Sequence, residues 1–187
     1  MRSEPVTDTS ADVIAGPARA AAGTADEVAA AEVIAELYRR DPSTRTFGIE
    51  LVEGSTGRAV VAMVVRADMC NGYDVCHGGM MFTLADTAMA FASGSHNHGA
   101  LAAAASIDFL HPVPNGSRVR ATAEERWLKG RSGLYDVRVE LDDGTLVAVF
   151  RGRTVRAGGA VVRRGGSDPT GEETDLDPPD LDTRGGA

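Results

Sequence analysis

Residues 79–93 read GMMFTLADTAMAFAS, and this stretch decides the fold of the chain. It is too long for an ordinary strand, and its leucine, methionine and alanine residues favour a helix. Its side chains are apolar almost all round, with Asp86 as the one charged exception. A helix that is apolar on all faces is typically buried. The sequence therefore predicts a long buried helix at the centre of the fold.

Segments with strand-like composition lie on both sides of this helix. They are residues 46–53, 58–67, 100–111, 117–129, 133–141 and 145–156. Short turns that contain glycine join several consecutive segments, which is typical of antiparallel hairpins. Because the strands come in runs and do not alternate with helices, we expect an α+β fold. An antiparallel sheet wrapped around the long central helix satisfies this order.

The two ends of the chain differ in composition from the middle. An amphipathic helix is predicted over residues 26–40, where Val33, Ile34 and Leu37 recur near helical spacing. Residues 1–25 and 159–187 lack apolar periodicity, and we expect both to be disordered tails, the second one acidic. The expected single domain spans residues 26–158.

The net charge of −8 is concentrated near the C-terminal end of the sequence. Residues 167–187 hold seven acidic residues and one arginine, so the remainder is nearly neutral. A nearly neutral domain disfavours nucleic-acid binding. The sequence has no apolar run of about 18 residues, which disfavours a membrane span, and no apolar leader. With only two cysteines as well, we expect a cytoplasmic protein.

Asp86 is the first candidate functional residue, because it lies within an otherwise apolar helix. Burying an unpaired carboxylate is costly and raises its pKa, so such a residue is kept when it is paired or used in chemistry. The alternative is a structural aspartate that is hydrogen-bonded by the hydroxyl of Thr83 or Thr87. The helix alone does not decide between these two interpretations.

The second candidate feature is the sequence His77-Gly78-Gly79 immediately before this helix. Glycines at this position allow a ligand to approach the backbone closely, and we expect Gly79 to contact substrate. The free N–H groups of the first helical turn would then polarise a carbonyl oxygen. The alternative is a plain junction between a loop and a helix.

Together these residues resemble the thioesterase superfamily with the hot-dog fold, and most closely its phenylacetate-degradation branch. The resemblance covers roughly residues 26–158. The residues that support it are Asn71, Gly72, residues 76–79, Phe82, residues 84–88 and 107–110, Pro112, residues 121–123, Gly133, Tyr135, Asp136 and residues 150–152. It implies hydrolysis of an acyl-coenzyme A thioester, with aryl-acetyl groups such as phenylacetyl or hydroxyphenylacetyl as the acyl class.

The resemblance also implies a role for each candidate. Asp86 resembles the catalytic carboxylate, which acts as nucleophile or as general base on water. Gly78 resembles the residue whose N–H polarises the thioester carbonyl. Asn71 resembles the side chain that places the water or the carboxylate, and His77 the histidine that orders the loop. No metal or other cofactor is implied, since coenzyme A belongs to the substrate.

Helix geometry gives an expectation about the assembly that does not depend on the family. Gly78 and Asp86 are eight residues apart, which is about 12 Å along a helix. One carbonyl carbon cannot lie within about 3 Å of both groups. We therefore expect a homo-oligomer with each active site shared between two chains. The resemblance extends this to a homotetramer, a dimer of dimers.

Other polar residues allow weaker hypotheses. Arg131, Arg151 and Arg153 are candidates to meet the phosphates of coenzyme A, and the alternative is that they are ordinary exposed strand charges. The spacing of the two cysteines does not favour a metal site. His96 and His98 are expected to be solvated loop residues.

Two rival functions remain on the same fold. One is a non-catalytic module that binds or senses acyl-coenzyme A, which would not need Asp86 or Asn71. The other is a hydratase, which would need a poised pair of aspartate and histidine. The position of His77 before the helix, with Asp86 within it, suits a thioesterase better.

Overall fold

The computed structural model describes residues 25–163. Three α-helices, one short 3-10 helix and six strands follow one another in this part of the chain. Before the long helix lie α1 (Ala25–Arg40), α2 (Pro42–Phe47), β1 (Glu50–Ser55), β2 (Arg58–Val64) and η1 (Ala67–Met69). The long helix α3 spans Gly78–Gly94, and β3 (Ala100–Phe109), β4 (Arg118–Lys129), β5 (Ser132–Leu141) and β6 (Leu146–Arg156) follow it.

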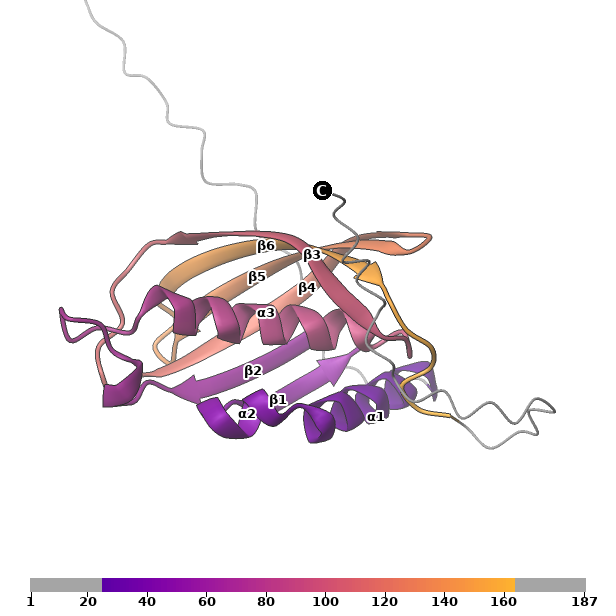
Figure 1. Cartoon of the computed structure of the whole chain (residues 1–187), viewed down its shortest axis with the longest axis horizontal. Coiled ribbons are helices and arrows are strands. Elements are labelled where there is room, and N and C mark those ends of the chain that lie inside the picture. The colour runs from indigo at the N-terminus through magenta and orange to yellow at the C-terminus, as the bar shows by residue number, and fades with distance from the viewer. Residues whose placement is uncertain (1–24, 164–187) are drawn as a thin grey trace, which may run out of the picture.

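The six strands form one antiparallel sheet in the order β1-β2-β4-β5-β6-β3. The sheet curves around α3, which lies across one of its faces, while α1 and α2 lie beside β1 (Figure 1). The fold predicted from the sequence, an antiparallel sheet wrapped around a long central helix, is confirmed. It is the hot-dog fold.

The core lies between α3 and the sheet. Leu84, Ala88 and Met89 of α3 are buried there, as is Phe150 of β6. Small residues let the helix approach the strands closely. At Gly152 of β6, for example, an added methyl group would lie only 2.2 Å from the sulfur of Met89. This close packing fixes the axial position of α3, and with it the position of Asp86.

The observed elements depart from the expected ones mainly at α2. Thr46 and Phe47 were expected in a strand, but they belong to this short helix. Asp41 caps it by accepting a hydrogen bond from the Ser43 N–H at 2.8 Å, and Pro42 occupies its first turn. Strand β1 therefore begins later than predicted, at Glu50.

The described chain continues beyond the domain boundary expected at residue 158. Val161 is buried, and the Asn97 side chain exchanges two hydrogen bonds with the backbone of Val162, at 2.8 and 3.0 Å. Residues 1–24 and 164–187, which contain most of both expected tails, lie outside the described residues. Within the described part, no helix is both long enough and apolar enough to span a membrane.

Candidate active site

The loop of residues 70–77 folds back on itself just before α3. Cys70 and Cys76 form an isolated antiparallel bridge at its base. The Asn71 N–H donates to the Val75 carbonyl at 2.9 Å on the loop side of this bridge. The loop therefore holds Asn71 and the start of α3 in one small region.

His77 caps α3, and this explains its position in the sequence. Its Nδ1 accepts a hydrogen bond from the Gly79 N–H at 2.9 Å. Nδ1 must be unprotonated to accept, so the proton of the neutral ring is on Nε2. The cap satisfies one of the free N–H groups of the first turn. The resemblance implies that His77 orders the loop, and the hydrogen bond to the Gly79 N–H is one way in which it can do so.

The N–H of Gly78 is the free donor at this helix end. Among the described residues it has no hydrogen-bond acceptor, while the next N–H is taken by His77. Gly78 is partly exposed, and the ring of Phe109 lies directly beside it. A methyl group at Gly78 would sit 2.9 Å from Cζ of that ring. Because these atoms are the outer end of a half-exposed side chain that can move aside, packing alone does not demand a glycine here, and the free N–H is a separate property of the position.

Asn71 has a local structural role in the isolated chain. Its Oδ1 accepts a hydrogen bond from the Tyr73 N–H at 2.9 Å, which closes an Asx turn. Asp74, at φ 58, completes the sharp reversal of the loop. The side-chain amide N–H groups of Asn71 have no partner among the described residues. They remain available to a substrate or a water molecule.

Asp86 has no hydrogen-bond or ion-pair partner within residues 25–163. The two hydroxyls that could have satisfied it are used elsewhere. Thr83 donates to the Gly79 carbonyl at 2.9 Å, and Thr87 donates to the Thr83 carbonyl at 2.8 Å. The interpretation of Asp86 as a residue satisfied by its threonine neighbours is therefore wrong.

The environment of this carboxylate is unusual for a charged group. Asp86 is half-buried, and this desolvation raises the pKa of its carboxyl. An unpaired, half-buried carboxylate with a raised pKa is the state expected of a general base or nucleophile. It lies toward the same side of α3 as the partly exposed Phe82 and the exposed Ala90.

The structure gathers three of the four candidate catalytic residues and separates the fourth. Asn71, His77 and Gly78 lie together at the start of α3, with Gly79 next to them. Asp86 lies about two turns further along the helix, at a rise of about 12 Å. Within a single chain they do not form one site for a single carbonyl group.

The three arginines proposed to meet coenzyme A lie elsewhere, and two of them are already engaged. Arg131 donates from Nε and from one terminal nitrogen to the carbonyl of Arg156, at 3.2 and 2.8 Å. Arg151 forms a two-bond ion pair with Asp136 at 2.6 and 2.9 Å, which lowers the pKa of that carboxyl. Arg153 has no hydrogen bond or ion pair within residues 25–163.

The direction of two of these arginines separates them from Asp86. Phe150 and Gly152 of β6 face α3, where Phe150 meets Phe82 edge-on at 5.2 Å. Because side chains alternate along a strand, Arg151 and Arg153 point to the opposite face of the sheet. Within one chain they are therefore remote from the carboxylate.

A polar cluster that the sequence did not suggest lies at the far end of α3. Glu125 of β4 accepts the Tyr135 hydroxyl at 2.8 Å and pairs with His96 Nε2 at 2.7 Å. His98 is only 9% exposed. Its pKa is lowered, mainly by burial and to a smaller extent by the positive charge of Arg156. The expectation that both histidines are solvated loop residues is wrong, because His98 is buried and His96 is paired.

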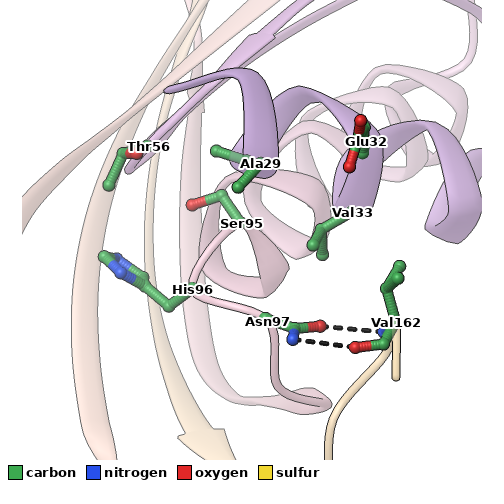
Figure 2. A pocket seen from close by; sticks show the side chains of 9 residues that line it. Ala29, Glu32, Val33, Thr56, Ser95, His96, Asn97 and Val162 are labelled. Atoms are coloured by element: carbon green, nitrogen blue, oxygen red, sulfur yellow. Dashed lines mark hydrogen bonds between the residues drawn. The ribbon is translucent and has the colours of Figure 1, made fainter. Parts of the chain in front are cut away.

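His96 also lines a cavity of about 450 Å³ between α1 and the loop after α3. Figure 2 shows this cavity, with Ser95 and His96 on one side and Val33 on the other. It is distant in sequence from the Asn71–Gly78 region, and we assign it no catalytic role. No group of three or more potential metal ligands occurs within residues 25–163.

A hot-dog domain whose central helix has a carboxylate without a partner in residues 25–163, and a free N–H at its start, suits the thioester-hydrolase class. Comparison with known proteins agrees. The model of the thioesterase superfamily matches residues 73–148. The acyl-coenzyme A thioesterase PaaI of Escherichia coli is 41% identical over 126 residues, which is 67% of this chain and 90% of that protein. The chain belongs to the thioesterase superfamily.

Two solved structures are similar in the same way. The structure of Escherichia coli PaaI, from the phenylacetic acid degradation operon, has a TM-score of 0.70 and 39% identity, covering 72% of this chain and 97% of that one. A mutant of the phenylacetic acid degradation protein PaaI from Thermus thermophilus has a TM-score of 0.60 and 38% identity, covering 62% and 99%. Both relatives are shorter than this chain, and each aligns with it over almost its whole length.

Proposed function

We propose that this thioesterase hydrolyses aryl-acetyl thioesters of coenzyme A, such as phenylacetyl-coenzyme A, in the cytoplasm and without a metal or redox cofactor. The observation on which the catalytic part rests is the half-buried carboxylate of Asp86, which lacks any partner within the described chain. A binding module would have no need to retain an unpaired charge in this position. The names of the similar PaaI proteins support the substrate class.

The proposed chemistry uses the two ends of the observed arrangement. The N–H of Gly78 donates to the thioester carbonyl oxygen, where negative charge develops as the carbon is attacked. Asp86 either attacks that carbon itself or removes a proton from the attacking water. In the general-base route the carbon–sulfur bond then breaks, and the proton that Asp86 took from water passes to the leaving thiolate, so the acid and the thiol of coenzyme A are released. In the nucleophilic route the thiolate leaves and takes a proton from solvent, and water then hydrolyses the mixed anhydride on Asp86, which releases the acid and restores the carboxylate. Asn71 holds the water or the carboxylate through its unused amide N–H groups.

The separation of Gly78 from Asp86 requires a second chain to complete this site. Strand β3 pairs with β6 on one side, and within residues 25–163 no strand pairs with its other edge. Its residues 101–106 are all exposed, including four consecutive alanines and Leu101. An open edge of small apolar residues is suited to pair with a second copy. We propose a dimer formed through β3, and a dimer of dimers as the complete enzyme.

Phe109 gives a physical reason to expect an aromatic acyl group. It ends β3 beside Gly78, and the residue is 51% exposed in the single chain. A carbonyl bound by the Gly78 N–H would place its acyl group close to this ring. Aromatic rings in such contact favour offset or edge-on packing, worth about 0.5–1.5 kcal/mol beyond simple burial. A flexible methylene between ring and carbonyl would help a phenyl group reach that packing.

A thiol-release assay with a panel of thioesters tests this proposal. We expect phenylacetyl- and hydroxyphenylacetyl-coenzyme A to give higher kcat/KM values than benzoyl- and straight-chain substrates. Phe109→Leu should reduce kcat/KM for phenylacetyl-coenzyme A by about 2–10-fold, equivalent to 0.5–1.5 kcal/mol, and leave straight-chain substrates nearly unchanged. Preference for straight chains would overturn the aryl-acetyl assignment. Tight binding without thiol release would favour a non-catalytic sensor.

A further inference from the structure

The two cysteines of the chain face each other across the base of the active-site loop. Cys70 and Cys76 are the partners of the isolated antiparallel bridge. The flanking hydrogen bonds join Asn71 to Val75 and His77 to Met69, and they do not involve the backbone of either cysteine. In such a non-hydrogen-bonded pair the Cα atoms lie about 4.5 Å apart and the side chains are close together.

This pairing suits a disulfide. Native disulfides join Cα atoms about 4.4–6.8 Å apart, and the expected separation lies at the lower end of that range. Both cysteines are reduced in the structure, where the Cys70 thiol donates to the Arg66 carbonyl at 3.5 Å and the Cys76 thiol to the His77 carbonyl at 3.7 Å, so closure has to replace these two weak hydrogen bonds. Cys76 is buried and Cys70 is partly exposed, so a reagent can meet Cys70 first. The two sulfur atoms are also close enough to interact, since Cys70 contributes to raising the pKa of Cys76.

We infer that Cys70 and Cys76 form a disulfide site that a peroxide can close, fixing the loop that holds Asn71 and begins α3. The closed loop would be short, since only five residues separate the two cysteines. The backbone already has the pairing that the disulfide requires, so closure should preserve the loop and not distort it.

The proposed oxidation balances in two steps. The Cys70 thiolate attacks one oxygen of hydrogen peroxide and becomes a sulfenic acid, while the other oxygen leaves as water after protonation. The Cys76 thiolate then attacks the sulfenic sulfur, the sulfur–sulfur bond forms, and a second water leaves. Two thiols are thus oxidised to one disulfide, and one peroxide is reduced to two water molecules.

The surroundings of the pair predict that this reaction is slow at neutral pH. Burial raises the pKa of Cys70, and the nearby Asp74 and Asp68 add to the effect. Burial raises the pKa of Cys76 to about 11, with a smaller contribution from Cys70. Because the thiolate is the reactive form, closure should accelerate as the pH rises.

Peroxide treatment of the full-length enzyme without substrate tests the inference. Free thiols should fall from two per chain to none, and the intact mass should fall by about 2 Da, with a monomeric band on a non-reducing gel. The rate should be higher at pH 9 than at pH 7. The Tm should rise on oxidation and return to its original value after reduction, and the amide of His77 should exchange more slowly in the oxidised form.

The single variant Cys70→Ser is the matched control, because it retains the buried thiol and removes its partner. Oxidation should then produce neither the loss of about 2 Da nor the rise in Tm. The inference would be overturned by disulfide-linked dimers of the wild-type chain. Persistence of both thiols under conditions that oxidise a model dithiol would overturn it equally. Conversion to sulfinic acid without cross-linking, a mass gain of about 32 Da, would do the same.

Discussion

Gly78, at the first position of α3, and Asp86, in the middle of the same helix, are separated by a rise of about 12 Å. Within residues 25–163, the N–H of Gly78 has no acceptor and the carboxylate of Asp86 has no partner. A single thioester carbonyl is too small to contact both. The two halves of the proposed chemistry therefore act together only when a second chain brings its own α3 alongside.

Mixing two inactive variants tests this shared site. Asp86→Asn removes the carboxylate, and Asn71→Ala damages the loop end of the site. In a mixed dimer one site has both lesions and the other has neither, so activity should return after subunit exchange. Random pairing makes about half of the dimers mixed, with one good site in two, so recovery should approach about a quarter of wild type.

The control for this experiment is a mixture of two differently tagged preparations of Asp86→Asn, which should exchange subunits and remain inactive. Exchange between the two variants without recovered activity would place Asn71 and Asp86 in the same chain's site. The proposed role of Gly78 would then have to be withdrawn.

A second prediction concerns the cap of α3. His77→Ala removes the acceptor for the Gly79 N–H, and loss of an N-cap should cost about 0.5–2 kcal/mol of stability. His77→Asn supplies another acceptor for the same N–H. We expect the asparagine variant to recover most of the Tm and of the activity that the alanine variant loses. Equal loss in both variants would show that His77 acts through something other than its cap.

The sequence predicts the fold well because its periodic segments are long. Residues 79–93 were expected in a helix, and α3 spans Gly78–Gly94. The strands after it begin and end within three residues of their expected limits. Helix α2 was missed because only six residues form it, and its ends depend on local capping by Asp41 and on Gly48 at φ 65. Those details outweigh the strand-like composition of its last residues.

The site was predictable only where function follows from residues that are close in sequence. Asp86 and the region around Gly78 could be chosen from one helix and its preceding loop. The partners of Arg151 and His96 could not, because Asp136 and Glu125 are 15 and 29 residues away from them. The pairing of Arg151 with Asp136 depends on the register of β5 and β6, which an amphipathic pattern specifies only to within two residues. The pairing of His96 with Glu125 depends on how the loop after α3 lies against β4, which no local pattern specifies.

Two truncations test where the folded part ends. A chain that ends at Arg163 retains Val161 in its buried position and the bonds between Asn97 and Val162. It should keep the wild-type Tm and turnover. A chain that ends at Gly158 loses these contacts, and we expect a lower Tm by thermal denaturation. A reduced Tm in the longer truncation would show that residues beyond 163 also stabilise the fold.

The raised pKa of Asp86 predicts how its replacement changes stability with pH. Burial raises the pKa of this carboxyl, so the folded chain binds its proton more tightly than the unfolded chain does. The contribution of this carboxyl to the stability of the folded chain is therefore greatest at low pH, where the group is protonated. That contribution is lost as the pH rises through the pKa that the group has in the folded chain. Asp86→Asn should raise the Tm at pH 7, and the gain should shrink as the pH falls toward about 4, the usual aspartate value.

The exposed residue Asp142 provides the control for that comparison. Asp142→Asn should change the Tm little at pH 7, because this side chain is exposed at the turn between β5 and β6. If Asp86→Asn lowers the Tm at pH 7, the carboxylate has a stabilising partner in the assembled enzyme.

The most direct test of the account is the turnover of Asp86→Asn on phenylacetyl-coenzyme A, measured as thiol release beside Asp142→Asn. The amide keeps the shape of the side chain and removes the base or nucleophile. We expect kcat to fall by a factor on the order of 10² or more, with the oligomeric state unchanged, while Asp142→Asn stays near wild type. A kcat for Asp86→Asn within a few-fold of wild type would contradict the assignment of Asp86 as the catalytic carboxylate.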